Sequence, residues 1–219
     1  MLTLVTHTQG SRPELLSRCI ESVEKQLIPG VRHVVIQTEE ILKARWEAKE
    51  LDEYIAFIDD DDIIVADVIA VAVAAINKHK PGLVFSDQAR VDETGKIISA
   101  SSQRQIKYHH IGMHPGVAHH LVVMRTSVLD EADKLHKKYS GTNQHGTLEW
   151  LMKGEAAMKG GAVHLPMIGY HWTMHPMNHS STVEWQNSFA TSMAFIGDDL
   201  RAMRPIDSEI LSWLPDHKT

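Results

Sequence analysis

The stretch YIAFIDDDD, residues 54–62, decides how this chain is interpreted. Its first five residues are apolar and rich in β-formers, which predicts a buried strand. Four adjacent carboxylates, Asp59 to Asp62, follow at once. They repel one another, and a divalent cation is the usual way such a cluster is tolerated, because hard cations prefer carboxylate oxygen. A solvated acidic turn is the alternative. The position favours a site, since α/β sheets bind ligands at the carboxyl ends of their strands.

Strands and helices alternate along the first half of the chain. Apolar runs predict strands at residues 2–6, 33–36, 54–58 and 83–87. Helical spacing of apolar residues predicts one helix that ends at Pro29-Gly30 and two others at residues 41–51 and 67–80. This alternation predicts parallel βαβ units. The expected fold is therefore α/β, with a Rossmann-like, mostly parallel central sheet flanked by helices.

The first of these helices has a clear start signal. Ser11 is the expected N-cap, Pro13 lies in the first turn and Glu14 stands three residues after the cap. An apolar stripe from Leu15 to Leu27 is expected to face the sheet. The stripe includes Cys19, the single cysteine, which is expected to be buried and which excludes an internal disulfide.

The pattern changes after residue 88. Residues 89–98 predict a hairpin around Glu93-Thr94-Gly95, and residues 99–116 predict a long loop. A strand at 119–124, helices at 128–138 and 147–158, and a strand at 163–170 follow. The chain then continues with a histidine-rich stretch at 171–181, a terminal helix at 183–204 and a short tail. With no repeat or linker, one domain over residues 1–219 is expected, divided into parts 1–98, 99–182 and 183–219.

Composition limits the classes of function. The 219 residues include 43% hydrophobic and 23% charged side chains, as expected for a soluble globular protein. The formal net charge of −6 argues against tight non-specific binding to nucleic acid. The N-terminus has no secretory signal pattern, and the longest apolar stretch, residues 63–76, is broken by Asp67 and too short to span a bilayer. A cytoplasmic location is therefore expected.

Four stretches, in this order, resemble a family 2 glycosyltransferase of the GT-A fold. They are the strand, loop and helix start at residues 6–16, the strand and Asp-x-Asp signature at 54–62, the strand and hairpin at 84–96, and Glu149-Trp150 with the closing strand at 170–175. Together they span most of residues 2–182. The resemblance implies a small stand-alone enzyme that moves a sugar, with inversion, from a nucleotide diphosphate sugar to a hydroxyl group. It also implies a smaller antiparallel region on the acceptor side.

The resemblance also implies roles for individual residues. Asp61 would hold Mn²⁺ or Mg²⁺, Asp59 would accept hydrogen bonds from the ribose hydroxyls, and Asp62 would be structural. His175 would contact metal or phosphate, in competition with His171 and His179. Glu149 would be the general base that deprotonates the acceptor hydroxyl. The expected donor-binding residues are Thr6, Thr8, Arg12, Gln37, Arg45, Asp59 and, in a supporting role, Asp60.

The chain departs from the family pattern where the second strand ends. Gln37 stands where acidic residues usually contact the nucleobase, which weakens the preference for UDP-sugars, and Trp46 follows Arg45, the expected phosphate contact. A non-catalytic nucleotide- or sugar-binding module is therefore an alternative, and a nucleotidyltransferase is a weaker one. The acceptor is open: a protein, a glycan, a small molecule, or a hydroxymethylated base in DNA contacted by the loop at 101–115.

Overall fold

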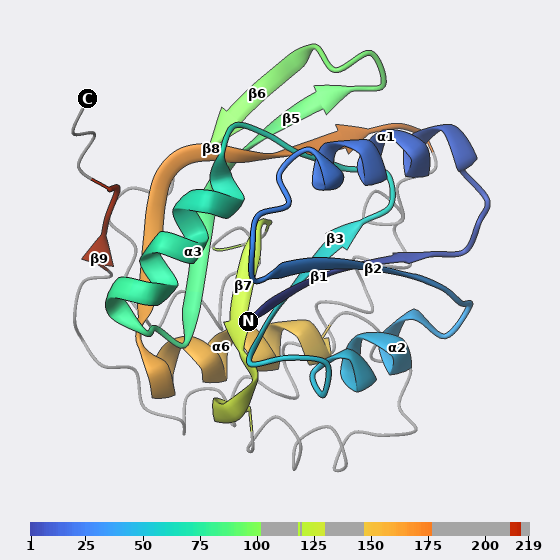
Figure 1. Cartoon of the computed structure of the whole chain (residues 1–219). Coiled ribbons are helices and arrows are strands. Elements are labelled where there is room, and N and C mark those ends of the chain that lie inside the picture. The colour runs from blue at the N-terminus through green and yellow to red at the C-terminus, as the bar shows by residue number, and fades with distance from the viewer. Residues whose placement is uncertain (102–117, 119, 130–146, 177–210, 216–219) are drawn as a thin grey trace.

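The computed structural model describes residues 1–101, 118, 120–129, 147–176 and 211–215. Helices and strands alternate through its first part, as the sequence predicts (Figure 1). Four α-helices lie in the described ranges: α1 (Pro13–Glu24), α2 (Ile41–Ala48), α3 (Val68–His79) and α6 (Thr147–Gly160). A short 3₁₀ helix, η1, lies at Thr126–Val128. The described strands are β1 (Leu2–Thr8), β2 (Val31–Gln37), β3 (Tyr54–Asp59), β4 (Ile63–Ile64), β5 (Leu83–Asp92), β6 (Ile97–Ser101), β7 (Val122–Arg125), β8 (Ala162–Met174) and β9 (Leu211–Ser212).

These strands form one sheet with the order β2-β1-β3-β7-β5-β8-β4, while β6 pairs with β5 and β9 pairs with β8. β1 lies between β2 and β3 and is parallel to both, and β5 is parallel to β8. β7 is antiparallel to both of its neighbours, β3 and β5. The predicted fold class is confirmed, but the fourth predicted strand is not the parallel neighbour of the third, because β7 separates them.

Two apolar clusters lie on opposite faces of the sheet. One packs α1 and α3 onto it through Cys19, Val23 and a run of α3 side chains that includes Ile69. The other packs α2 and α6 against the reverse face through Ala48 and Met152. Figure 1 shows these two pairs of helices on either side of the strands. Cys19 is fully buried, as predicted, and burial raises the pKa of its thiol to about 12. In the described ranges no helix has both the length and the apolar character needed to cross a bilayer.

The first helix differs from the prediction at both ends. Its N-cap is Arg12, not Ser11, and the helix has no side-chain capping hydrogen bond. It ends at Glu24, five residues before Pro29, because the following amides of Gln26 and Leu27 bond to carbonyls three residues back and tighten the turn. Leu27, predicted to be buried, is consequently 40% exposed.

β5 and β8 extend well beyond their predicted ends, and two short strands, β4 and β9, were not predicted. β5 runs through residue 92 and includes the first arm of the predicted hairpin, whose second arm is β6. β5 pairs in parallel with β8 as far as Met174. Residues 171–174, the start of the histidine-rich stretch, therefore belong to a strand. The tail at 211–215 returns to the sheet as β9, where Trp213 donates its amide to His164. α2 ends at Ala48, three residues early.

Three predicted segments lie outside the described residues: the loop at 102–116, most of the helix at 128–138 and the terminal helix at 183–204. The sheet joins strands from residues 1–98 and from 99–182. The division into one domain with three parts stays a prediction.

His33 on β2 gives a prediction for stability against pH. Its Nε2 lies 2.9 Å from the Thr6 hydroxyl, and burial lowers the pKa of the ring. A pKa that is lower in the folded chain than the unfolded value near 6.5 means that the neutral ring stabilises the fold fully above pH 6.5. That contribution is lost as the pH falls from 6.5 through the folded pKa. His33→Gln should therefore lose less stability between pH 7.5 and pH 5.5 than the unchanged protein. Urea unfolding at both pH values measures this, and an identical loss in both proteins would contradict it.

Candidate active site

The acidic cluster lies at the carboxyl end of β3, at the edge of the sheet where β1 also ends. The parallel register runs from Leu2 opposite Tyr54 to His7 opposite Asp59, so Thr8 and the carboxylates leave the sheet together. A tight turn follows, in which the Asp62 amide donates to the Asp59 carbonyl at 3.1 Å. Asp60, Asp61 and Asp62 are 4%, 9% and 1% exposed. The interpretation as a solvated acidic turn is therefore wrong.

Asp60 and Asp61 are held by one arginine from the start of α1. Arg12 Nη2 donates to Asp60 Oδ1 at 2.5 Å, and Arg12 Nη1 donates to Asp61 Oδ2. The Thr8 hydroxyl donates to the other oxygen of Asp60 at 2.6 Å. Burial raises the pKa of Asp60, while the Thr8 hydroxyl and the Arg12 guanidinium oppose that rise. Thr8, Arg12, Asp60 and Asp61, all predicted as site residues, thus meet at one place.

His175 completes this group from the end of β8. Its Nε2 lies 2.8 Å from Asp61 Oδ2 and 2.9 Å from Arg12 Nη1, and the ring is buried. The contact between Asp61 and His175 joins residues 114 positions apart in the chain. Of the three histidines considered, His171 lies half-buried within β8, where burial lowers its pKa, and His179 lies outside the described residues.

Asp62 is almost fully buried, with 1% of its surface exposed. Its carboxylate accepts the Thr173 amide at 2.8 Å, and its Oδ2 is buried without a hydrogen-bond partner. Burial, with the neighbouring charges of Asp61 and Asp59, raises the pKa of Asp62 well above the usual value. The Asp59 amide donates to the Tyr170 hydroxyl at 3.2 Å, which fixes the start of the turn against β8. Asp62 therefore anchors the turn against β8.

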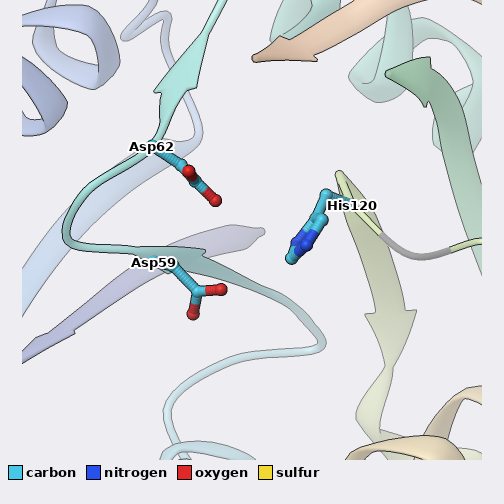
Figure 2. A group of neighbouring side chains, drawn as sticks. All are labelled: Asp59, Asp62 and His120. Atoms are coloured by element: carbon cyan, nitrogen blue, oxygen red, sulfur yellow. The ribbon is translucent and has the colours of Figure 1, made fainter. Parts of the chain in front are cut away.

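His120 is a site residue that the sequence analysis missed. Ligand atoms of Asp59, Asp62 and His120 all lie within 4.8 Å of one another. Figure 2 shows the ring of His120 facing the turn that carries the two aspartates. The ring stacks on Tyr170, with centroids 4.7 Å apart and planes at 7°. A histidine just before a strand carries no local signal of a site, and only the antiparallel pairing of β7 with β3 brings it here.

The other predicted donor-binding residues divide into two groups. Arg45 of α2 donates to Asp59 Oδ1, and its guanidinium lies 5.3 Å from the ring centroid of Phe57. Gln37 ends β2 opposite Thr8 in the register and is exposed. Thr6, in contrast, is fully buried, and its hydroxyl faces His33 and Cys19. Arg45 therefore joins the carboxylates and Gln37 borders them, whereas Thr6 is turned into the core.

Glu149 lies in the first turn of α6, where it was predicted. Its side chain lies outside the part of the chain that the structure describes. The predicted role as general base stays a prediction.

Two groups of side chains have donor sets that suit a divalent cation. Adjacent ligands of an octahedral Mg²⁺ are about 3.0 Å apart, given metal–oxygen distances of about 2.1 Å. Asp61 Oδ2 and His175 Nε2 are 2.8 Å apart and match that spacing. The atoms of Asp59, Asp62 and His120, up to 4.8 Å apart, would have to close to about 4.2 Å even for opposite ligands of the same ion. In this structure Asp61 and His175 form a hydrogen bond, whereas Asp59, Asp62 and His120 are a group of three possible ligands within the described residues.

Comparisons with known proteins show which solved structures share this fold. No protein-family model and no curated protein matches the sequence. Residues 1–349 of S. aureus TarS in complex with UDP-GlcNAc match with a TM-score of 0.60 and 17% identity, over 90% of this chain and 66% of that one. The same fragment in complex with UDP gives a TM-score of 0.55 and 16% identity, over 87% and 64% of the two chains.

A longer S. aureus TarS structure matches with a TM-score of 0.59 and 15% identity, over 90% of this chain and 39% of that one. The chain thus spans 66% or less of the length of each of these TarS chains. At such identities the likeness shows the fold. The chain shares the α/β fold of these TarS structures.

Proposed function

We propose that the protein is a metal-dependent, inverting glycosyltransferase that moves a sugar from a nucleotide diphosphate sugar, with UDP-sugars favoured, to a hydroxyl group. The observation that carries this proposal is the convergence of Arg12, Asp61 and His175 at the carboxyl ends of β1 and β3. Ligands of open α/β sheets bind at such an edge. The TarS structures that share the fold include complexes with UDP-GlcNAc and with UDP, which supports a nucleotide-sugar donor.

Each side chain of the site has a role that its chemistry supports. Asp61 and His175 would hold Mg²⁺ or Mn²⁺, which when bound neutralises charge on the leaving diphosphate. Asp59 is the most exposed of the four carboxylates, with 37% of its side chain accessible, and can accept hydrogen bonds from the ribose hydroxyls. Arg45 donates to Asp59 and would add positive charge near a diphosphate bound at this edge of the sheet. The exposed amide of Gln37 can contact the edge of the base.

Glu149 is the proposed base. Glu149→Gln keeps the size of the side chain but cannot take the proton from the acceptor hydroxyl, so the transfer rate should fall by at least about a hundredfold. Binding of the donor should stay within about twofold, because the general base acts on the acceptor. Steady-state rates and calorimetric titration with UDP separate the two effects. Equal losses in donor binding and rate would instead place Glu149 in donor binding.

The proposed function is tested by calorimetric titration with nucleoside diphosphates, with Mn²⁺ and with chelator, followed by a panel of nucleotide sugars. Binding of UDP that requires Mn²⁺, and slow release of UDP from one of the sugars, are the expected results. Binding of UDP that survives chelation and is unchanged in Asp61→Ala would instead favour a non-catalytic binding module. Release of pyrophosphate from a nucleoside triphosphate would favour a nucleotidyltransferase.

The proposed acceptor is a hydroxyl group on a glycan or on a hydroxymethylated base in DNA. The net charge of −6 makes DNA the second choice, because binding to phosphates depends on positive charge. A transfer assay on hydroxymethylated duplex DNA and on an oligosaccharide panel, at two salt concentrations, distinguishes the two acceptors.

A further inference from the structure

The guanidinium of Arg12 lies where an ion held by Asp61 and His175 would bind. Its Nη1 contacts Asp61 Oδ2 and lies 2.9 Å from His175 Nε2, so one cationic nitrogen touches both of the expected ligand atoms. Its Nη2 reaches Asp60 Oδ1 at 2.5 Å. The arginine therefore occupies the ligands of the ion before any ion arrives.

Asp60 has the contacts of an anchor for the arginine. Its two oxygens are each engaged, one by the Thr8 hydroxyl at 2.6 Å and one by Arg12 Nη2 at 2.5 Å. The Thr8 hydroxyl is itself fixed, since it accepts the Gly10 amide at 2.9 Å. Arg12 can therefore leave Asp61 and His175 while one arm of its guanidinium stays on Asp60. Its side chain is 19% exposed.

We propose that Arg12 is a resident counter-cation, which a divalent ion must displace from Asp61 and His175 and which then binds the diphosphate of the donor. This inference rests on the proposed function. A divalent ion and a guanidinium repel each other, and Arg12 Nη1 is in contact with both Asp61 Oδ2 and His175 Nε2, so the two cations compete for these atoms. The ion alone therefore binds against competition, whereas a diphosphate gives Arg12 a new partner, because an arginine fork matches phosphate oxygens. The ion and the nucleotide should then each strengthen the binding of the other, and part of this coupling should depend on Arg12.

The test is Mn²⁺ titration followed by the electron paramagnetic resonance of free Mn²⁺, with and without UDP. The protein is compared with Arg12→Gln and with Arg18→Gln, a control on the same helix whose arginine instead donates to the Glu93 carbonyl. Arg12→Gln should bind Mn²⁺ alone about tenfold more tightly than the unchanged protein, and the enhancement by UDP should shrink by a similar factor. Arg18→Gln should match the unchanged protein in both measurements.

The outcomes separate the inference from the function on which it rests. If the unchanged protein binds Mn²⁺ with UDP, but Arg12→Gln binds Mn²⁺ alone no more tightly, only the inference is overturned. If neither the unchanged protein nor Arg18→Gln binds Mn²⁺ with UDP, the proposed function fails as well. If Arg12→Gln does not fold, the inference is tested in the unchanged protein by NMR of its ¹⁵N-labelled arginine side chains. Saturating Mg²⁺ should shift the Arg12 signals and leave those of Arg18 in place, and unmoved Arg12 signals overturn the inference.

Discussion

Asp61→Asn is expected to lower metal-dependent sugar transfer by on the order of a thousandfold and to leave the fold intact. The amide keeps the shape of the carboxylate but loses the charge that would hold the ion. Arg12 is not left unpaired by this change, because Asp60 stays 2.5 Å from its Nη2. The melting temperature should therefore change by only a few degrees. Transfer rates at saturating Mn²⁺, measured beside thermal unfolding, check both parts.

Asp67→Asn is the matched control for that variant. Asp67 is an exposed carboxylate at the N-cap of α3, and it makes no side-chain capping hydrogen bond. Its loss should leave the transfer rate unchanged. Asp62→Asn and His120→Gln test the second candidate group for the ion. If these two variants lose Mn²⁺ binding while Asp61→Asn keeps it, the ion belongs with Asp59, Asp62 and His120.

Gly82→Ala is expected to destabilise the protein by about 3 kcal/mol, through a collision of backbones. Gly82 precedes β5 and donates its amide to the Gly160 carbonyl at 2.8 Å, at the end of α6. A Cβ on Gly82 would lie 1.9 Å from the Ala156 carbonyl oxygen and 2.8 Å from Gly160 Cα. No flexible side chain is there to yield, so α6 must move away from the sheet. For a chain of this size the melting temperature should fall by about 10 °C.

Gly30→Ala is the comparison that isolates crowding. Gly30 has φ +86° and nothing within 4 Å of an added Cβ, so alanine there meets backbone strain alone, worth about 1 kcal/mol. Gly82→Ala should therefore melt well below Gly30→Ala. Equal melting temperatures for Gly82→Ala and Gly30→Ala would mean that α6 moves away from the sheet at little cost in free energy. The displaced helix carries Glu149 at its other end, so Gly82→Ala should also slow sugar transfer.

The strand that leads into the acidic cluster could be predicted because its signal is local. Five apolar residues followed by four carboxylates mark a strand end in any α/β sheet, and β3 ends at Asp59 as expected. The start of α1 shows where local reasoning failed. Ser11 has the better capping side chain, but Arg12 makes ionic contacts to Asp60 and Asp61, residues 48 and 49 positions away. Contacts that distant in the chain decide the cap and leave no trace in the neighbouring sequence.

The order of the strands could not be predicted for the same reason. Periodicity identified the strand around residues 122–124 but contains no information on its neighbours, and β7 lies antiparallel between β3 and β5. That placement brings His120 to Asp59 and Asp62, so the missed strand neighbour and the missed site residue have one cause. The roles of Asp61, His175 and Glu149 came from the family resemblance, and the structure adds the contacts of the first two.

The contacts that tie the acidic turn to β8 also set the order in which the protein can fold. Asp59 with Tyr170, Asp62 with Thr173 and Asp61 with His175 each close a loop of 111 to 114 residues. Loops of that length close late, because their entropy is lost before the contacts form. The β1–α1–β2 unit should therefore gain its secondary structure first during refolding. The capacity to bind Mn²⁺ should appear only in the last phase, so newly made chains stay inactive until β8 docks.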